Sequence, residues 1–558
     1  MCGILTLLKK EIIESDIKKF KLSLDKINYR GPDFNKILRK ENILFGHNRL
    51  KILDLSSKSN QPFEFKNFTL LFNGCIYNFK ELRDELKTKY IFSTTGDTEV
   101  LMYSLIEWGE KALEKIDGMY AFVFFDGVNL MCSVDYFGEK PLYLYQDKEK
   151  IIISSEICSI KSQLNNQLLV DDSQKSLREF YHLGYLLGEK TIYKNLYKLS
   201  HKNIYFINKE LKVNKVLKKS KFYNKFNTNI DDIHQELIHS IKNRLNSDVP
   251  FCLFLSSGID SVLLATLIKK ELKINIETFS FYKKNEIENI DFIKNFTDHL
   301  GIKSKIISDL SDEFKVKDFK NAYDDINECD TFFPYYEMCK SIKKNTNIKV
   351  ILTGMGADEI FYGYNKYKFF YKYNKLYSIN GKVYDFINFL GNKLKIKVLK
   401  KSKIFTDNNF SRFLKIKNND YDTRYKEINE FNNKIEIFKS ARNFDIDNTM
   451  PLSLIPALER ASMRASLESR SPYLSEKLLN LVNNLSNNNI IFKEQKNIQK
   501  QILRNYLPEK YIPKRKLGFF YRNPKTFKVS HGLEEKYFLK SKNYRYNQRL
   551  QIYDLFQV

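Results

Sequence analysis

The sequence predicts a layered α+β sandwich in the first half of the chain, followed by an α/β domain with a doubly wound parallel sheet and a helical C-terminal part. Three observations support this fold class. The chain has 558 residues, which is long enough for two to four domains with cores of their own. Many short apolar runs with intervening helices fill the first half. In the second half, predicted strands and helices alternate, as is typical of a parallel sheet.

The first half is expected to contain short strands separated by turns and helices. Alternating apolar positions within residues 46–54, Leu50 and Ile52 among them, predict one strand. Residues 70–72 predict another, which runs into the polar segment 73–78 (N-G-C-I-Y-N). Residues 80–90 predict a helix.

The second half is expected to alternate strands with helices. Residues 231–245 predict an amphipathic helix with one apolar face. A buried strand at 250–255, a serine-glycine loop at 255–261 and an apolar helix at 262–268 follow. Further strands are predicted at 276–281, 303–307 and 350–353, and the last runs into a glycine-containing loop at 354–361. Ligands of doubly wound sheets bind at the carboxyl ends of the strands, so the two loops should face one another.

Composition argues against several classes of protein. The seven cysteines are an odd number and lack C-x-x-C spacing, so neither a zinc site nor a disulfide framework is expected. No apolar run approaches the roughly 18 residues of a membrane span. The short apolar stretch at 4–8 is followed rather than preceded by lysines, unlike a signal peptide. We therefore expect a cytoplasmic protein without a membrane segment.

The net charge of +26 permits binding to nucleic acid or to an anionic surface. However, the lysines are dispersed and accompanied by many Asn, Ile, Tyr and Phe residues, a composition that an AT-rich genome also produces. They are densest at residues 366–403, where a basic helical surface is the simpler interpretation. Nucleic-acid binding is therefore not expected as a main function.

The loop at residues 255–261 carries the first chemical signal. A strand, a short turn and a helix N-terminus form an anion site, because free backbone N–H groups and the positive end of the helix dipole point outward. Gly258 lets the backbone approach the anion closely, whereas Asp260 beside a phosphate calls for a metal ion. The G-x-x-x-x-G-K-[ST] pattern of the common NTPase loop is absent. The alternative is an ordinary turn before a helix.

Cys2 carries the second chemical signal. Because Met1 is normally removed ahead of a small residue, Cys2 would hold a thiol and a free α-amine. The amine, with a pKa of about 8, can take the thiol proton directly or through water and so activate a nucleophile. The alternative is a buried small hydrophobic residue.

After Cys2, the segments 29–33 (Y-R-G-P-D), 46–54, 73–78, 96–100 and 137–143 resemble, in this order, the N-terminal-nucleophile (Ntn) glutaminase domain of the glutamine-hydrolysing asparagine synthetases. The resemblance covers roughly residues 2–160 and implies an Ntn-hydrolase sandwich, which we place at residues 2–205. It implies that Cys2 attacks the side-chain amide of glutamine. The other implied residues are Asn73 and the Gly74 N–H for the oxyanion, Arg49 for the substrate carboxylate and Asp97 for its α-ammonium. Cys75 stands where the family usually has Glu.

The second half resembles the synthetase domain of the same family, which we place at residues 206–520. The loop 255–261 resembles the S-G-G-x-D-S pyrophosphate loop of the N-type ATP pyrophosphatases, and residues 354–359, 459–474, 500–504 and 514–519 resemble further family motifs. The resemblance implies cleavage of ATP to AMP and pyrophosphate, with Mg²⁺ held by Asp260 and Asp358 and with Lys500 contacting the phosphates and the adenylate. The implied ATP-binding residues are Leu255, Ser256, Ser257, Gly258, Asp260, Ser261, Ser280, Thr353 and Gly354. The implied acceptor-binding residues are Glu359, Arg460, Glu468 and Arg470. Residues 521–558 form an extension without a recognisable motif.

Three departures from the family pattern concern the acceptor. Met355 replaces an acidic residue at the active centre, and Ser475 replaces the Asp of a P-F-L-D segment. Residues 324–326 read D-D-I where D-E-P is usual, and Asp330 is offset from the expected spacing. A thioether carries no charge with which to bind an ammonium, so acceptor-side residues differ while the phosphate residues are kept.

The sequence therefore predicts an amidotransferase that uses glutamine, ATP and a carboxylate acceptor. Ammonia made at Cys2 would cross an internal, mostly apolar passage to an adenylated carboxylate. Aspartate is the default acceptor, and a uronic acid of a surface polysaccharide is the variant. A nucleic-acid-binding protein that uses this fold for RNA modification, and an inactive scaffold, are the alternatives from other classes. The sequence leaves the oligomeric state open, with a homodimer as one option.

Overall fold

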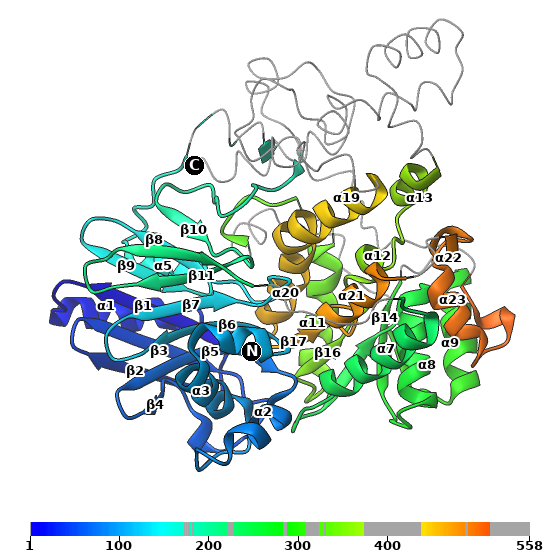
Figure 1. The fold of residues 1–558 in the computed structure, drawn as a ribbon, viewed down its shortest axis with the longest axis horizontal. Helices are drawn as coiled ribbons and strands as arrows, with labels where there is room; N and C mark the ends of the chain where they lie inside the picture. Colours follow the sequence, from blue (N-terminus) through cyan, green and yellow to red (C-terminus); the bar gives the residue numbers. More distant parts are fainter. Residues whose placement is uncertain are drawn as a thin grey trace, which may run out of the picture.

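In a computed structural model of the protein, the described residues are 2–171, 173, 176, 179–180, 183–219, 227–282, 287–307, 323–328, 331–372, 437–485 and 489–513. The two halves lie side by side, each built around its own sheets (Figure 1). Asp330, most of the lysine-dense segment, the motif at 514–519 and the extension at 521–558 lie outside the described residues.

The first half contains two six-stranded antiparallel sheets (Figure 1). The first sheet has the order β10-β8-β9-β1-β3-β2, made of β1 (Gly3–Lys9), β2 (Phe34–Lys40), β3 (Ile43–Arg49), β8 (Tyr143–Gln146), β9 (Lys150–Ser154) and β10 (Leu196–Lys198). The second has the order β12-β11-β7-β6-β5-β4, made of β4 (Phe63–Phe65), β5 (Phe68–Ile76), β6 (Gly118–Phe125), β7 (Leu130–Val134), β11 (Asn203–Ile207) and β12 (Val213–Leu217).

Strand β1 shows why the sheets stack in layers. Its side chains alternate between faces, as strand geometry requires. Ile4 and Leu8 pack between the two sheets, whereas Leu5 and Leu7 face the helices that cover the first sheet. Those helices are α1 (Glu14–Asp25) and α5 (Ile157–Gln163), and α2 (Phe79–Leu86) and α3 (Asp97–Trp108) cover the second sheet. The result is the predicted layered α+β sandwich.

The second half contains one parallel sheet of five strands in the order β15-β14-β13-β16-β17. The strands are β13 (Phe251–Phe254), β14 (Glu277–Phe281), β15 (Ser304–Ile307), β16 (Val350–Leu352) and β17 (Glu468–Arg470). The chain leaves β13 toward β14 on one side, while β16 pairs with β13 on the other. In such sheets this reversal marks the ligand-binding crevice, at the carboxyl ends of the strands.

Helices cover both faces of this sheet, because successive strand residues point to opposite sides. Leu253 packs with α7 (Ile230–Arg244) and α8 (Ile259–Lys270). Cys252 and Phe254 face the opposite way, toward α11 (Phe332–Asn345) and α20 (Ile455–Arg464). The structure therefore confirms the predicted α/β architecture with its helical C-terminal part.

Two predicted boundaries are wrong. Strand β3 ends at Arg49 rather than at residue 54, because the following loop folds back around the Arg49 guanidinium and Asp54 adopts a left-handed backbone with φ 50°. Leu50 and Ile52 consequently lie beyond the strand. Helix α2 ends at Leu86 rather than at residue 90.

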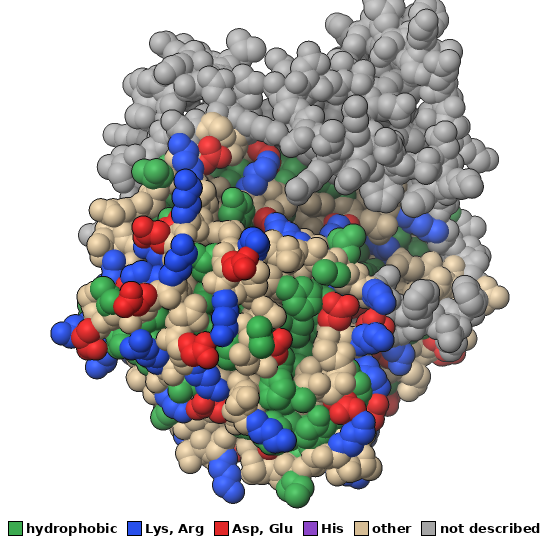
Figure 2. All heavy atoms as spheres, turned by 60° about the vertical axis from the view of Figure 1, so that its left-hand side comes forward, with side chains coloured by type: hydrophobic (Ala, Val, Ile, Leu, Met, Phe, Trp, Pro, Cys, Tyr) green, Lys and Arg blue, Asp and Glu red, His purple; other side chains and the backbone are tan. Residues whose placement is uncertain are grey.

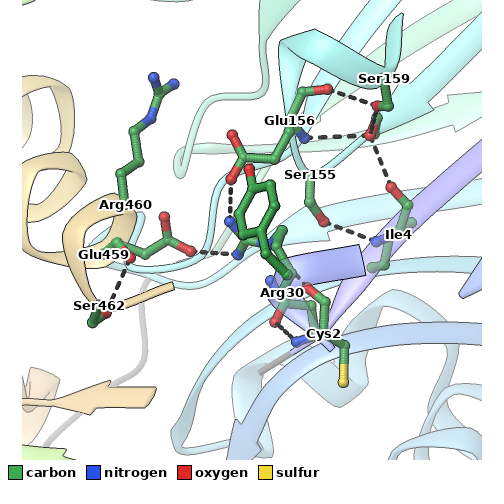
Figure 3. Close-up of polar contacts among 12 residues, drawn as sticks. Cys2, Ile4, Arg30, Ser155, Glu156, Ser159, Glu459, Arg460 and Ser462 are labelled. Carbon is green, nitrogen blue, oxygen red and sulfur yellow. Dashed lines mark hydrogen bonds and ion pairs between the residues drawn. The ribbon is translucent and has the colours of Figure 1, made fainter. Parts of the chain in front are cut away.

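A buried ion network joins the two halves (Figure 3). The Arg30 guanidinium contacts Glu156 of the first half and Glu459 of the second half, and Arg30 and both acids are at most 3% exposed. Arg30 also donates through Nε to the Cys2 carbonyl, at 3.1 Å. The network therefore ties the first residue of the described chain to the interface.

Replacing Arg30 by Met should lower the free energy of unfolding by about 3–5 kcal/mol, because two buried carboxylates lose their counter-charge. Differential scanning calorimetry would measure the loss. Lys349→Met is the matched control, since its 2.7 Å pair with Asp33 also crosses the interface but is about one-quarter exposed. We expect less than about 1 kcal/mol for the control. Equal effects from both variants would contradict the role of burial.

Basic and acidic side chains are interspersed on the face drawn in Figure 2, and no single basic patch dominates it. Within the described part of the chain, every helix is too short or too polar to cross a membrane.

Candidate functional site

Cys2 directly precedes β1, beside the interface network drawn in Figure 3. The backbone N–H of Cys2 donates to Oδ1 of Asn73 at 2.8 Å, and Cys2 is 7% exposed. Burial raises the pKa of the Cys2 thiol, while the positive amino terminus and Arg49 act in the opposite direction. Burial outweighs these positive groups, so the nucleophile needs a base to take the thiol proton.

Asn73 and Gly74 lie beside Cys2 on strand β5. Oδ1 of Asn73 accepts from the Cys2 N–H, but Nδ2 of Asn73 is buried without a hydrogen-bond partner among the described residues. A Cβ on Gly74 would lie 2.0 Å from the carbonyl oxygen of Met119, and φ of Gly74 is +154°. Only glycine fits there. A buried amide with a free donor beside a thiol is the geometry that stabilises an oxyanion.

Arg49 and Asp97 border the same space from β3 and from the start of α3. Nη1 of Arg49 donates to the Ser56 carbonyl at 2.7 Å and to Asn60 at 2.8 Å. Asp97 accepts from the Ile76 N–H at 2.9 Å, and burial raises its pKa to about 6. One cation and one acid therefore flank the thiol, as an amino-acid ligand requires.

Apart from Asn73, these residues line a first pocket of about 380 Å³ that includes residues of both halves. The lining residues are Cys2, Arg49, Leu50, Ile52, Leu53, Gln61, Phe72, Gly74, Cys75, Asp97, Thr98, Glu468 and Arg470. The last two come from β17, the edge strand of the parallel sheet. The first pocket is thus completed by the second half of the chain.

Arg470 separates the first pocket from a second one. Its Nε donates to Glu468 at 2.6 Å and its Nη1 to the carbonyls of Arg244 and Asn246, at 2.8 and 2.7 Å. Nη2 is buried without a hydrogen-bond partner among the described residues. The second pocket, of about 260 Å³, is lined by Glu139, Lys140, Thr353, Met355, Ile455, Leu458, Glu459, Ser469, Arg470, Ser471 and Leu474. Its lining mixes charged and apolar residues.

The serine loop follows β13, as predicted, and its hydroxyl groups hold the loop itself. The Ser261 hydroxyl accepts from the Ser256 N–H at 2.9 Å and donates to the Gly258 carbonyl at 3.1 Å. No side chain caps the N-terminus of α8, which begins directly after Gly258. An added Cβ on Gly354 would lie 3.3 Å from Cβ of Asp260. The two glycine loops therefore do face one another, with an uncapped helix end between them.

Asp260 and Asp358 meet across this crevice, and both contact the ammonium group of Lys496. Lys496 Nζ lies 2.9 Å from Oδ1 of Asp358 and also contacts Oδ2 of Asp260. No cluster of three or more acidic, His or Cys side chains suited to a metal occurs among the residues described. Two carboxylates fit Mg²⁺, which is usually bound by one or two protein carboxylates together with substrate phosphates and water.

The other predicted residues of the second half lie farther from this crevice or apart from one another. Lys500 pairs with Glu494 at 2.6 Å instead of with either Asp. Arg460 lies in the interface, where it donates to the Tyr143 hydroxyl. Glu359 accepts from Tyr364 at 2.6 Å, and burial raises its pKa to about 7. Ser280 is fully buried, with no hydrogen-bond partner for its hydroxyl among the described residues.

The departures from the family pattern fall in different places. Met355 lines the second pocket. Ser475 instead caps α21 (Glu476–Asn483), accepting from the Leu478 N–H at 3.2 Å. Asp325 accepts from the Ile192 N–H at 3.0 Å. Of these three, only Met355 lines either pocket.

Sequence reasoning missed Lys496. It lies four residues before Lys500 and directly precedes α23 (Asn497–Arg504), in a left-handed conformation that no local pattern signals.

Comparisons with known proteins agree with this arrangement. A model described as a glutamine amidotransferase domain matches residues 1–220, and one described as asparagine synthase matches residues 232–543. Asparagine synthetase (glutamine-hydrolyzing) 1 of Bacillus subtilis (strain 168) is 30% identical over 354 residues, covering 61% of this chain and 55% of the relative. A putative asparagine synthetase (glutamine-hydrolyzing) 2 of Methanocaldococcus jannaschii is 28% identical over 435 residues, covering 71% of this chain and 81% of the relative.

Among solved structures, glutamine phosphoribosylpyrophosphate amidotransferase from B. subtilis matches 63% of this chain and 81% of its own, with a TM-score of 0.31 and 12% identity. The matched part of this chain spans about half the length of the first B. subtilis relative, at 55%.

Proposed function

The chain belongs to the asparagine synthase family, whose model covers residues 232–543, and from this premise we propose that it is a glutamine-dependent amidotransferase. It would hydrolyse glutamine in the first pocket and amidate a carboxylate in the second, using ATP. One observation carries the proposal: the Cys2 pocket and the Met355 pocket share Arg470 as a common wall.

In the first pocket, Sγ of Cys2 attacks the side-chain carbonyl carbon of glutamine. The Asn73 Nδ2 and the Gly74 N–H stabilise the oxyanion of the tetrahedral intermediate. The C–N bond breaks, ammonia leaves with the proton of the thiol, and water hydrolyses the thioester to glutamate. Arg49 binds the α-carboxylate and Asp97 the α-ammonium of the substrate. The free α-amine of Cys2 takes the proton of the thiol, and the contact of this nitrogen with Asn73 Oδ1 orients it.

In the second half, the uncapped end of α8 and the loops after β13 and β16 bind the ATP phosphates. The acceptor carboxylate attacks the α-phosphorus and expels pyrophosphate, and ammonia then displaces AMP from the acyl adenylate. Mg²⁺ held by Asp260 and Asp358 would neutralise the leaving pyrophosphate. The Nη2 of Arg470, which has no hydrogen-bond partner in the described part of the chain, belongs to the residue that lines both pockets.

The acceptor is aspartate by default, with a larger carboxylate such as a uronic acid as the variant. The decisive experiment measures AMP release with a panel of carboxylates, at saturating ammonia and then with glutamine. AMP release that depends on one carboxylate supports the proposal and identifies the acceptor. No release with any carboxylate, together with salt-dependent RNA retention, would favour the RNA-modifying alternative.

Met355→Glu should raise aspartate-dependent turnover by about tenfold or more. Free aspartate brings an ammonium and two carboxylates, and an unpaired charge is costly to bury. Met355 offers it an apolar surface in the second pocket. The assay is AMP and asparagine formation at saturating ammonia, which bypasses the first pocket. Met355→Leu, apolar and of similar volume, is the control and should leave aspartate turnover unchanged. Efficient asparagine synthesis by the unsubstituted protein would contradict the prediction.

The proposal includes the organisation expected from the sequence. It places a glutaminase domain at residues 2–205, a synthetase domain at 206–520 and an extension at 521–558. It also includes a cytoplasmic location and leaves open a homodimer, which size-exclusion chromatography with light scattering would detect.

A further inference from the structure

Lys496 lies between the two carboxylates to which the proposed function assigns a metal. Its side chain is 5% exposed, and its Nζ contacts Asp260 Oδ2 and lies 2.9 Å from Asp358 Oδ1. Burial disfavours the charged ammonium, but Asp260 and Asp358 outweigh it and hold the pKa of Lys496 above its ordinary value. The ammonium is therefore charged and occupies the space between the two acids.

The backbone is shaped to place this lysine there. Lys496 has φ 57° and ψ 41°, a left-handed conformation that is strained for a residue other than glycine and persists only where its surroundings enforce it. Gly363 provides the space: an added Cβ would lie 2.1 Å from Asp358 Oδ1 and 2.9 Å from Lys496 Cε. A side chain at position 363 would thus displace the ion pair.

Lys500 is not in an equivalent position. Its Nζ pairs with Glu494 Oε2 at 2.6 Å, and the other oxygen of Glu494 binds Arg504 at 2.9 Å. Lys496 alone of the two lysines contacts Asp260, the second residue of α8. It therefore lies beside the helix end that would receive the phosphates.

We propose that Lys496 is a tethered cation that holds Asp260 and Asp358 in the nucleotide-free protein and moves to the phosphate oxygens when the nucleotide binds. The inference rests on the proposed function, because it uses the same crevice. An ammonium bonded to both acids competes with a divalent cation for their oxygens. A triphosphate offers that ammonium alternative anionic partners, which leaves both carboxylates free. Metal binding and nucleotide binding are therefore coupled through Lys496.

The test is a titration of the full chain with Mn²⁺, followed by calorimetry or electron paramagnetic resonance. Without nucleotide, Lys496→Gln should bind Mn²⁺ about tenfold or more tightly than the unsubstituted protein, because the competing ammonium is gone. Without metal, the same variant should bind inorganic pyrophosphate about tenfold or more weakly. A gain in Mn²⁺ affinity together with a loss in pyrophosphate affinity distinguishes this role from a general loss of structure, which would weaken both.

Lys477→Gln is the matched control. It removes the same charge from a 2.7 Å pair with Glu236, whose side chain is 5% exposed, and it should change neither affinity. The double variant Lys496→Gln/Asp358→Asn should lose the gain in Mn²⁺ affinity. If Lys496→Gln fails to fold, Lys496→Met replaces it with an apolar chain of similar length.

Unchanged Mn²⁺ affinity in a folded Lys496 variant would overturn the inference, as would unchanged pyrophosphate affinity. These outcomes are independent of AMP formation by the unsubstituted protein, which tests the proposed function instead. If the unsubstituted protein releases no AMP, but the Lys496 variant binds Mn²⁺ more tightly and pyrophosphate more weakly, the proposed function is refuted and the role of Lys496 is retained.

Discussion

Cys2→Ala should lower glutamine-dependent AMP formation by at least about 10⁴-fold, because the reaction loses its nucleophile. AMP formation with added ammonium salts should stay at the level of the unsubstituted protein. The physical reason is that the two pockets are distinct and have only Arg470 in common among their lining residues, so that ammonia can be supplied from solution to the second pocket without chemistry in the first. Parallel assays of AMP with glutamine and with ammonium chloride measure both effects.

Cys132→Ala is the control for this experiment. Cys132 is a fully buried cysteine in the core between the two sheets of the same half and lines neither pocket. Its loss should lower stability and spare both activities. Loss of ammonia-dependent activity in folded Cys2→Ala would contradict the division of labour. Mass spectrometry of active protein should show a chain that starts at Cys2, since a retained Met1 blocks the α-amine.

Local sequence was sufficient to predict the strand-loop-helix unit around Gly258 and its counterpart at Gly354. Apolar runs of strand length that end in small polar residues determine both units within a few neighbouring positions. The sequence also predicted that the two loops face one another, because parallel strands end at the same edge of the sheet. The Cys2 and Asn73 contact likewise joins two motifs that the sequence singled out.

Other features depend on contacts that local patterns do not encode. Arg470 and Glu468 were assigned to the acceptor, yet both line the Cys2 pocket, because β17 is the edge strand nearest the first half. Lys496 reaches an acid 236 positions away, through a left-handed turn that no propensity predicts. Ser475 was noted as a departure that concerns the acceptor, and in the structure it caps α21, a role that Ser fills as readily as Asp.

The second large effect is expected from the acids of the crevice. Asp260→Asn and Asp358→Asn should each lower AMP formation by about 10²–10³-fold, equivalent to several kcal/mol of transition-state stabilisation. One fewer carboxylate weakens the hold on the cation that neutralises the leaving pyrophosphate. Asn keeps the size of Asp, so packing around Lys496 and Gly363 is retained. Glutamine hydrolysis at Cys2, measured as glutamate release, should be spared in both variants.

Glu277→Gln is the matched control, because it removes a carboxylate at the first residue of β14, at the opposite end of the same sheet. Its pairs with Lys303 and Lys305, at 3.5 and 3.0 Å, lie away from the nucleotide crevice, so AMP formation should be unchanged. The assay is a Mg²⁺ titration at saturating ATP and ammonia. A weakened metal site predicts that excess Mg²⁺ restores part of the rate in either Asn variant. AMP formation at the unsubstituted rate across the whole titration would remove that Asp from the metal site.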